Sequence, residues 1–169
     1  MKKFLLVSLS VMLISTFFAG LASPATAEEP KILEFHTMVG TTAGLTGAQS
    51  QAVLRGVSGG GLPWTLTSAH GELKANGKLE IEVQGLVLAA GASTGSNPSA
   101  VFRALVSCLR SDGSVQNILT EAFPATTGPA SSGGGNAKIE TTVALPHPCI
   151  APIVFVTNNA GSWFAVTGN

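Results

Sequence analysis

The chain has 169 residues, of which 45% are hydrophobic and only 11% charged, with nine basic and nine acidic side chains. Such a composition excludes a general nucleic-acid binder, which needs a basic face, and a disordered chain, which needs high charge and few apolar residues. Glycine (20) and proline (9) are frequent and tyrosine is absent, which favours many short strands joined by turns.

The N-terminus has the order of features found in a secretory signal peptide. Lys2 and Lys3 precede an uncharged, mostly apolar stretch, and Pro24-Ala25-Thr26-Ala27 supplies an Ala-x-Ala cleavage site. The apolar stretch is short for a membrane span and no positive flank follows it. We therefore expect residues 1–27 to be a cleaved secretory signal peptide.

The remaining residues, 28–169, are predicted to form a single β-rich domain that is secreted, to the periplasm or the extracellular medium. No later segment has enough unbroken apolar length to cross a bilayer, so no transmembrane segment is expected after cleavage. Without Lys2 and Lys3, seven basic and nine acidic side chains remain, which gives a net charge near −2.

The first half of this domain contains several weak strand signals and one strong one. We expect strands over residues 31–39, 51–57 and 63–69, with Gly-rich loops between them. The strong signal is Asn76-Gly77, the favoured pair for a type I′ turn, between residues 71–75 and 78–84.

The second strand of this predicted hairpin alternates between apolar and charged residues. Leu79, Ile81 and Val83 point one way, while Lys78, Glu80, Glu82 and Gln84 point the other. This pattern is typical of a half-buried strand with one wet face.

The second half of the domain is also predicted to consist of strands joined by loops. Residues 101–109 are apolar on both faces apart from Arg103 and Ser107, which predicts an interior strand. Strands over residues 115–123, 137–145, 150–157 and 162–167 follow, and residues 89–100 and 124–136 are predicted to be loops. Because an unpaired buried guanidinium is costly, Arg103 is expected to meet a carboxylate or a backbone carbonyl, or to lie at an exposed edge.

The elements together predict an all-β fold of about nine short strands. We expect an antiparallel, Greek-key-like β-sandwich, with a closed β-barrel as the alternative. Cys108 and Cys149 are the only cysteines in the sequence, and in an oxidising compartment they are predicted to form one disulfide. Closing a loop of about 40 residues stabilises the domain by roughly 4 kcal/mol in the chain-entropy description.

Candidate binding residues are few. Trp64 and Trp163 lie beside Gly-rich turns, where an indole ring can stack on a sugar or anchor a partner, although packing in the core is the alternative role. His147, between two prolines, is a further candidate. A partner for these residues would be a glycan, a wall polymer or an envelope protein.

Catalytic and metal-binding patterns are weak. The three histidines, His36, His70 and His147, show no ligand spacing, no Gly-x-Ser-x-Gly elbow occurs, and no phosphate loop is present in the sequence. We assign no catalytic residue, metal ligand or cofactor from the sequence. The leading hypothesis is a non-enzymatic β-domain with a structural or binding role at or outside the cell envelope. The alternative is a small secreted hydrolase or metal-binding protein that uses His70 or His147 with a glutamate.

Overall fold

The computed structural model describes residues 28–42 and 53–167. Within them lie fifteen strands and one short 3-10 helix, so the fold is all-β. The predicted signal peptide, residues 1–27, lies outside the described part of the chain. In the part that is described, no helix has the length and apolar character needed to span a bilayer.

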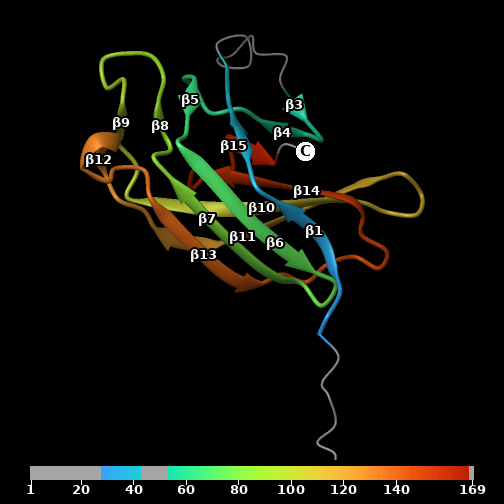
Figure 1. The fold of residues 1–169 in the computed structure, drawn as a ribbon. Coiled ribbons are helices and arrows are strands. Elements are labelled where there is room, and N and C mark those ends of the chain that lie inside the picture. Colours follow the sequence, from blue (N-terminus) through green and yellow to red (C-terminus); the bar gives the residue numbers. More distant parts are fainter. Residues whose placement is uncertain (1–27, 43–52, 168–169) are drawn as a thin grey trace, which may run out of the picture.

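Nine of the strands form two antiparallel sheets, as expected for a sandwich. Figure 1 shows the four-stranded sheet in front of the five-stranded one. The four-stranded sheet has the order β1 (Lys31–Phe35), β6 (Ser68–Lys74), β7 (Lys78–Gln84) and β13 (Ala137–Thr142). The five-stranded sheet has the order β11 (Val115–Pro124), β10 (Val101–Leu109), β14 (Ile150–Thr157), β15 (Trp163–Thr167) and β2 (Met38–Gly40). None of the sheets closes on itself, so the alternative of a closed barrel is wrong.

Six two-residue strands form three small ladders outside the two main sheets. They pair as β3 with β4, β5 with β8, and β9 with β12. Their bounds are β3 (Val53–Leu54), β4 (Val57–Ser58), β5 (Trp64–Thr65), β8 (Val87–Leu88), β9 (Ser96–Asn97) and β12 (Gly128–Pro129).

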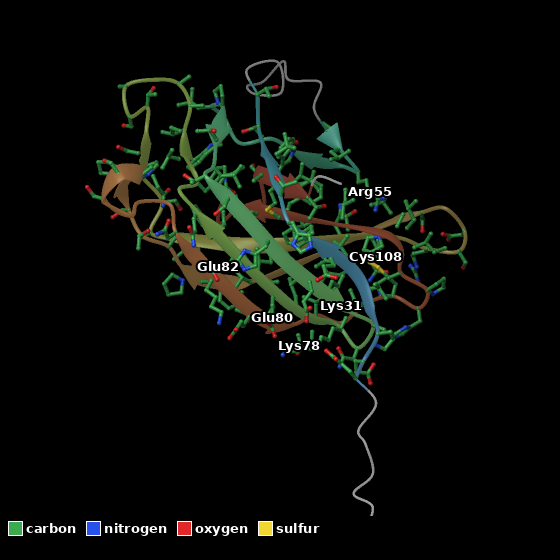
Figure 2. All side chains as sticks on the ribbon, viewed as in Figure 1. Lys31, Arg55, Lys78, Glu80, Glu82 and Cys108 are labelled. Carbon is green, nitrogen blue, oxygen red and sulfur yellow. A yellow bond between two sulfur atoms is a disulfide. The ribbon has the colours of Figure 1, made fainter. Side chains whose placement is uncertain are left out.

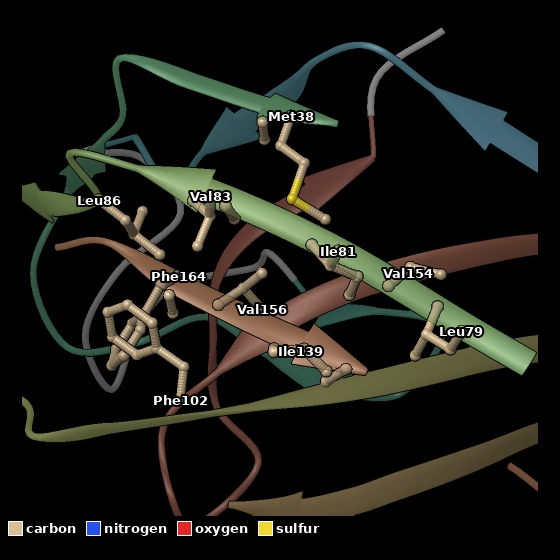
Figure 3. Close-up of a cluster of buried hydrophobic side chains, with 14 of the residues drawn as sticks. Met38, Leu79, Ile81, Val83, Leu86, Phe102, Ile139, Val154, Val156 and Phe164 are labelled. Atoms are coloured by element: carbon tan, nitrogen blue, oxygen red, sulfur yellow. The ribbon is translucent and has the colours of Figure 1, made fainter. Parts of the chain in front are cut away.

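The core lies between the two sheets. Leu79, Ile81 and Val83 project from β7, and Val154 and Val156 meet them from β14, all at most 2% exposed (Figure 3). Because side chains alternate along a strand, the charged residues between them must point outward. The predicted half-buried strand is confirmed.

The hairpin predicted around Asn76-Gly77 is also confirmed. β6 and β7 pair in register from Ser68–Gln84 to Leu73–Leu79, and Gly77 has a positive φ of 89°. The Asn76 side-chain oxygen accepts a hydrogen bond from the Lys78 amide at 3.0 Å. The predicted type I′ turn is wrong, however, because Gly77 has a positive φ and Asn76 does not. The connection is a three-residue loop, Ala75-Asn76-Gly77, in which the Gly77 amide donates to the Lys74 carbonyl at 2.9 Å.

Two of the strands predicted near the N-terminus are wrong in extent. The chain does not run as one strand over residues 31–39, because it leaves the four-stranded sheet after Phe35 and joins the other sheet as β2. Residues 51–57 do not form one strand either: residues 51 and 52 lie outside the described part, and a hairpin turn at Arg55-Gly56 separates β3 from β4. Arg55 and Gly56 both have positive φ, 50° and 78°, as a type I′ turn requires.

The strand predicted over residues 63–69 is interrupted as well. β5 ends at Thr65 and β6 begins at Ser68, where the chain moves from the small ladder with β8 into the four-stranded sheet.

The two long segments predicted as loops contain some regular structure. β9 lies within residues 89–100, and β12 with the 3-10 helix Ala130–Ser132 lies within residues 124–136. Asn97 joins the two segments, because its buried side-chain nitrogen donates to the carbonyl oxygens of Ser99 and Thr126, both at 2.8 Å. Side-chain hydrogen bonds of this kind cannot be predicted from the pattern of hydrophobic residues in the sequence.

β10 and β14 have the bounds that the sequence predicts, and both lie inside the five-stranded sheet. Arg103 meets backbone carbonyls, one of the partners expected for it. Its Nε donates to the Thr120 carbonyl at 2.6 Å and its Nη1 to the Asn159 carbonyl at 3.0 Å.

The predicted disulfide is confirmed. Cys108 on β10 and Cys149, just before β14, are joined by an S–S bond of 2.06 Å, and the described chain has no free cysteine. The bond links two neighbouring strands of one sheet at the end where β14 begins.

Candidate functional site

The outer face of the four-stranded sheet carries a row of four glutamates. Cross-strand pairing places Glu34 opposite Glu72, Glu72 opposite Glu80, and Glu80 opposite Glu140, so the row crosses all four strands. Like charges directly opposite one another destabilise a sheet unless other charges compensate them. We call Glu34, Glu72, Glu80 and Glu140 the glutamate row.

Lysines provide that compensation. Every member of the glutamate row has a lysine ammonium within 3.3 Å. The ion pairs join Lys31 to Glu34 (3.0 Å) and Glu72 (2.9 Å), Lys74 to Glu72 (3.3 Å), Lys78 to Glu80 (2.5 Å), and Lys138 to Glu140 (2.6 Å).

Glu72 has the most enclosed carboxylate of the row, with 21% of its side chain exposed. The hydrogen bond from Lys31, and after it that from Lys74, lowers the pKa of the Glu72 carboxyl below its ordinary value. In return, the same carboxylate is the main cause of the raised pKa of the Lys31 ammonium. At neutral pH these groups are charged, so the face presents closely alternating charges of both signs.

A second row lies beside the first. His70, Glu82 and Lys138 are in register on β6, β7 and β13, and we call them the mixed row. His70 Nε2 lies 3.7 Å from Glu82 Oε2, and both side chains are largely exposed. His36 follows β1 directly at this level of the sheet.

A groove of about 270 Å³ runs between the two rows. Glu34, Glu72 and Glu80 line one part of it, and the mixed row with His36 lines the rest. Its floor includes Gly71, where an added Cβ would lie 2.6 Å from Phe35 Cζ and 2.3 Å from the Glu80 carbonyl oxygen. Only glycine allows the Phe35 ring to pack this closely on β6.

Two further grooves adjoin the first. One, of about 470 Å³, shares Glu82 and Lys138 with it and reaches Pro124 and Thr126. The other, of about 370 Å³, shares Glu80 and reaches Thr142. Glu82 and Lys138 line both the first and the second groove, and Glu80 lines the first and the third. Figure 2 labels Lys31, Lys78, Glu80 and Glu82 on this sheet.

The structure places His147 apart from the other two histidines. It lines a small cavity of about 100 Å³ with Leu145, Pro146 and Cys149, and no glutamate lines that cavity. His70 is thus the histidine that the fold brings next to a glutamate. Among the described residues, no group of three His, Cys, Asp or Glu side chains is arranged to hold a metal ion.

Both tryptophans are buried. Trp64 is 6% exposed and stacks on Phe164, with ring centroids 3.9 Å apart, while Trp163 is 3% exposed and packs against Phe155. Their rings therefore serve in packing, the alternative role that the sequence leaves open, and offer little surface for stacking on a ligand.

The sequence predicts the solvent-exposed face of β7 but not the glutamate row or the mixed row. Each strand contributes only one residue to each row, so no local motif marks them. The rows depend on the register between strands that are up to about a hundred residues apart in the chain. The pairing of Phe35 with Gly71 sets the register between β1 and β6, and no sequence pattern indicates this pairing.

Comparisons with protein-family models, with curated proteins and with solved structures found no match. The candidate site therefore rests on the geometry of this chain alone.

Proposed function

We propose that the protein is a non-enzymatic β-domain that is exported from the cytoplasm and has a binding role at or outside the cell envelope. The observation that carries this proposal is that two shallow grooves adjoin a third on one face of the sheet and share its charged residues, Glu82 and Lys138 in one case and Glu80 in the other. The disulfide between Cys108 and Cys149 supports an oxidising compartment, and with it the predicted signal peptide.

The shape and chemistry of the grooves favour an extended polar partner. Open grooves that adjoin one another on one face suit a polymer better than a compact small molecule, which usually binds in an enclosed, mostly apolar pocket. Carboxylates, ammonium groups and imidazoles can donate and accept hydrogen bonds along such a chain. We propose a glycan or wall polymer as the partner, ahead of an envelope protein.

The test is co-sedimentation with insoluble polymers, using purified peptidoglycan and chitin. The double variant Glu82→Gln/Lys138→Gln removes two charges of opposite sign, so the net charge does not change. We expect this variant to bind about tenfold less of the polymer that the native protein binds, because each lost charge-assisted hydrogen bond weakens binding. Glu29→Gln, which alters an exposed glutamate outside the grooves, is the matched control.

Equal sedimentation of the native protein and the double variant would contradict the proposed groove. Failure of the native protein to sediment with either polymer would contradict the choice of partner. Thermal unfolding of both variants establishes that a change in binding is not a loss of fold.

The contact between His70 and Glu82 favours a second candidate, a hydrolase or metal-binding protein that uses this pair. An imidazole beside a carboxylate is an arrangement that can transfer a proton or hold a cation. This candidate predicts that Zn²⁺ raises the melting temperature of the native protein, that a chelator reverses the rise, and that His70→Asn abolishes it. An unchanged melting temperature with Zn²⁺ would remove the metal-binding form of this candidate.

A further inference from the structure

The outer face of the five-stranded sheet differs in character from the charged face opposite. One row crosses the whole sheet in register and consists entirely of apolar residues: Val39, Val166, Phe155, Leu105 and Leu119. A second apolar row, Val115, Leu109 and Ile150, crosses three strands at the far end. Ile153 lies between the rows on β14 and is partly exposed. We call these two rows and Ile153 the outer apolar face.

The β3–β4 hairpin covers the middle of this face. Val57 packs on Leu105, Phe155 and Trp163 to form a small second core. Arg55 at the turn donates from Nη1 to the Ser107 carbonyl at 3.0 Å, and the Asn117 side chain donates back to the Arg55 carbonyl at 2.9 Å. The hairpin is therefore fixed to the sheet at its tip.

Large apolar side chains remain exposed on both sides of the hairpin and on the hairpin itself. Val39 is 54% exposed at one edge, while Val115 and Ile150 are 43% and 44% exposed at the far end. Val53 and Leu54 of β3 are 55% and 40% exposed. Of the six large hydrophobic side chains that are exposed in the described part of the chain, five belong to this face or its hairpin. Such a concentration marks an interaction surface.

The basic residues on this side are arginines. The sequence has three: Arg55 on the hairpin, Arg103 on β10, and Arg110 in the turn between β10 and β11. The four lysines of the described chain belong instead to the four-stranded sheet. Arginine binds phosphate through paired N–H donors, whereas lysine acts as a point charge.

Two of these arginines have a carboxylate nearby. Asp112 lies in the β10–β11 turn close to Arg110, where it accepts hydrogen bonds from Ser114. Glu121 of β11 is directed toward β13, since its Oε1 accepts a hydrogen bond from the Thr141 hydroxyl at 2.9 Å. After hydrogen bonds from its own backbone and from Thr141, the charge of Arg103 also lowers the pKa of the Glu121 carboxyl. The margin of the outer apolar face therefore holds three arginines and two carboxylates.

We propose that the outer apolar face docks on the surface of an anionic phospholipid bilayer. Exposed valine, leucine and isoleucine side chains enter the boundary of the acyl chains, and the arginines contact lipid phosphates. A second copy of the chain fits less well. A two-fold contact through this face would bring two sets of arginines together with fewer carboxylates than arginines to pair them. This inference goes beyond the proposed function and does not depend on it, because it concerns the opposite face.

The test is flotation of the purified protein with vesicles. One set contains phosphatidylglycerol and phosphatidylcholine in equal amounts, and the other contains phosphatidylcholine only. We expect binding to the anionic vesicles that weakens as salt increases, with little binding to the neutral ones. The double variant Val53→Ser/Leu54→Ser should bind the anionic vesicles about tenfold less, because two exposed apolar side chains no longer leave water.

The matched control is Leu62→Ser. Leu62 is 43% exposed, close to the exposure of Leu54, but it lies outside the two rows. Its side chain is next to Gly91, in the loop that follows β8. Leu62→Ser should bind the vesicles like the native protein.

Three results would overturn the proposal. One is the absence of native protein from the floated anionic vesicles. Another is equal binding by the double variant, whose fold is verified by circular dichroism and thermal unfolding. The third is a stable dimer in sedimentation equilibrium that Val53→Ser/Leu54→Ser dissociates, since the face would then be a contact between copies.

Discussion

The Arg55 guanidinium donates a hydrogen bond to the backbone carbonyl of Ser107, 52 residues further along the chain. This contact fixes a short hairpin on the outside of the five-stranded sheet. It acts together with the burial of Val57 and the hydrogen bond from Asn117 to the Arg55 carbonyl. Isolated two-stranded hairpins are marginally stable, so β3 and β4 depend on these contacts with the sheet.

Replacement of Arg55 should therefore weaken the domain. We expect Arg55→Ala to lower the free energy of unfolding by about 1–2 kcal/mol, because a hydrogen bond from a charged donor is lost. Arg55→Asn loses the same contact but tolerates the left-handed backbone, so it should cost less. Urea denaturation of both variants measures the difference, and native stability in Arg55→Ala would contradict the assigned role.

The stacking of Trp64 on Phe164 gives a second prediction. Trp64→Ala should reduce the free energy of unfolding by about 3–5 kcal/mol, because it leaves a large cavity in the core. Trp64→Phe keeps an aromatic ring for the stack and should lose less. The measurement is again urea denaturation. A small effect of Trp64→Ala would indicate that the indole ring is not part of the core.

The pairing of Glu72 with Lys31 and Lys74 predicts the response to acid. The pKa of the Glu72 carboxyl is lowered from its ordinary value of 4.5, so its contribution to stability is complete above that pH. The contribution is lost as the pH falls below 4.5 through the lowered pKa. In Glu72→Gln this part of the acid sensitivity should disappear. Urea denaturation between neutral pH and pH values of about 3 compares the two proteins, and identical pH profiles would contradict the prediction.

The disulfide supplies a fourth prediction. Cys108→Ala/Cys149→Ala should lower the free energy of unfolding by about 2–5 kcal/mol, because the unfolded chain is no longer cross-linked. Mass spectrometry of the unfolded, unreduced native protein should find no thiol that can be alkylated. Two alkylated thiols in that sample would contradict the bond.

Much of the fold could be predicted from the sequence where patterning and turn chemistry agree. The alternation in residues 78–84 and the Asn76-Gly77 pair both indicate the β6–β7 hairpin, and the structure has it. The bounds of β10 and β14 could also be predicted, because a buried strand appears in the sequence as a nearly continuous run of apolar residues.

The remaining features depend on contacts that no local pattern records. Residues 31–39 alternate like one strand, yet the chain changes sheets after Phe35, since only tertiary packing decides which sheet a strand joins. Arg55-Gly56 is a turn that requires positive φ at an arginine, which is uncommon and therefore hard to predict. The glutamate row depends on the register between all four strands of its sheet. The sequence indicates the pairing of β6 with β7 only.

We propose that the grooves on the four-stranded sheet bind a wall polymer. A nuclear magnetic resonance titration tests this proposal most directly. Soluble peptidoglycan fragments, and separately chitin oligosaccharides, are added to the isotope-labelled protein, and backbone amide shifts are followed. We expect one of these probes to shift amides of β7 and β13 around Glu82 and Lys138, and we expect Glu82→Gln/Lys138→Gln to abolish the shifts. Shifts confined to the five-stranded sheet, or no shift with either probe, would contradict the proposal.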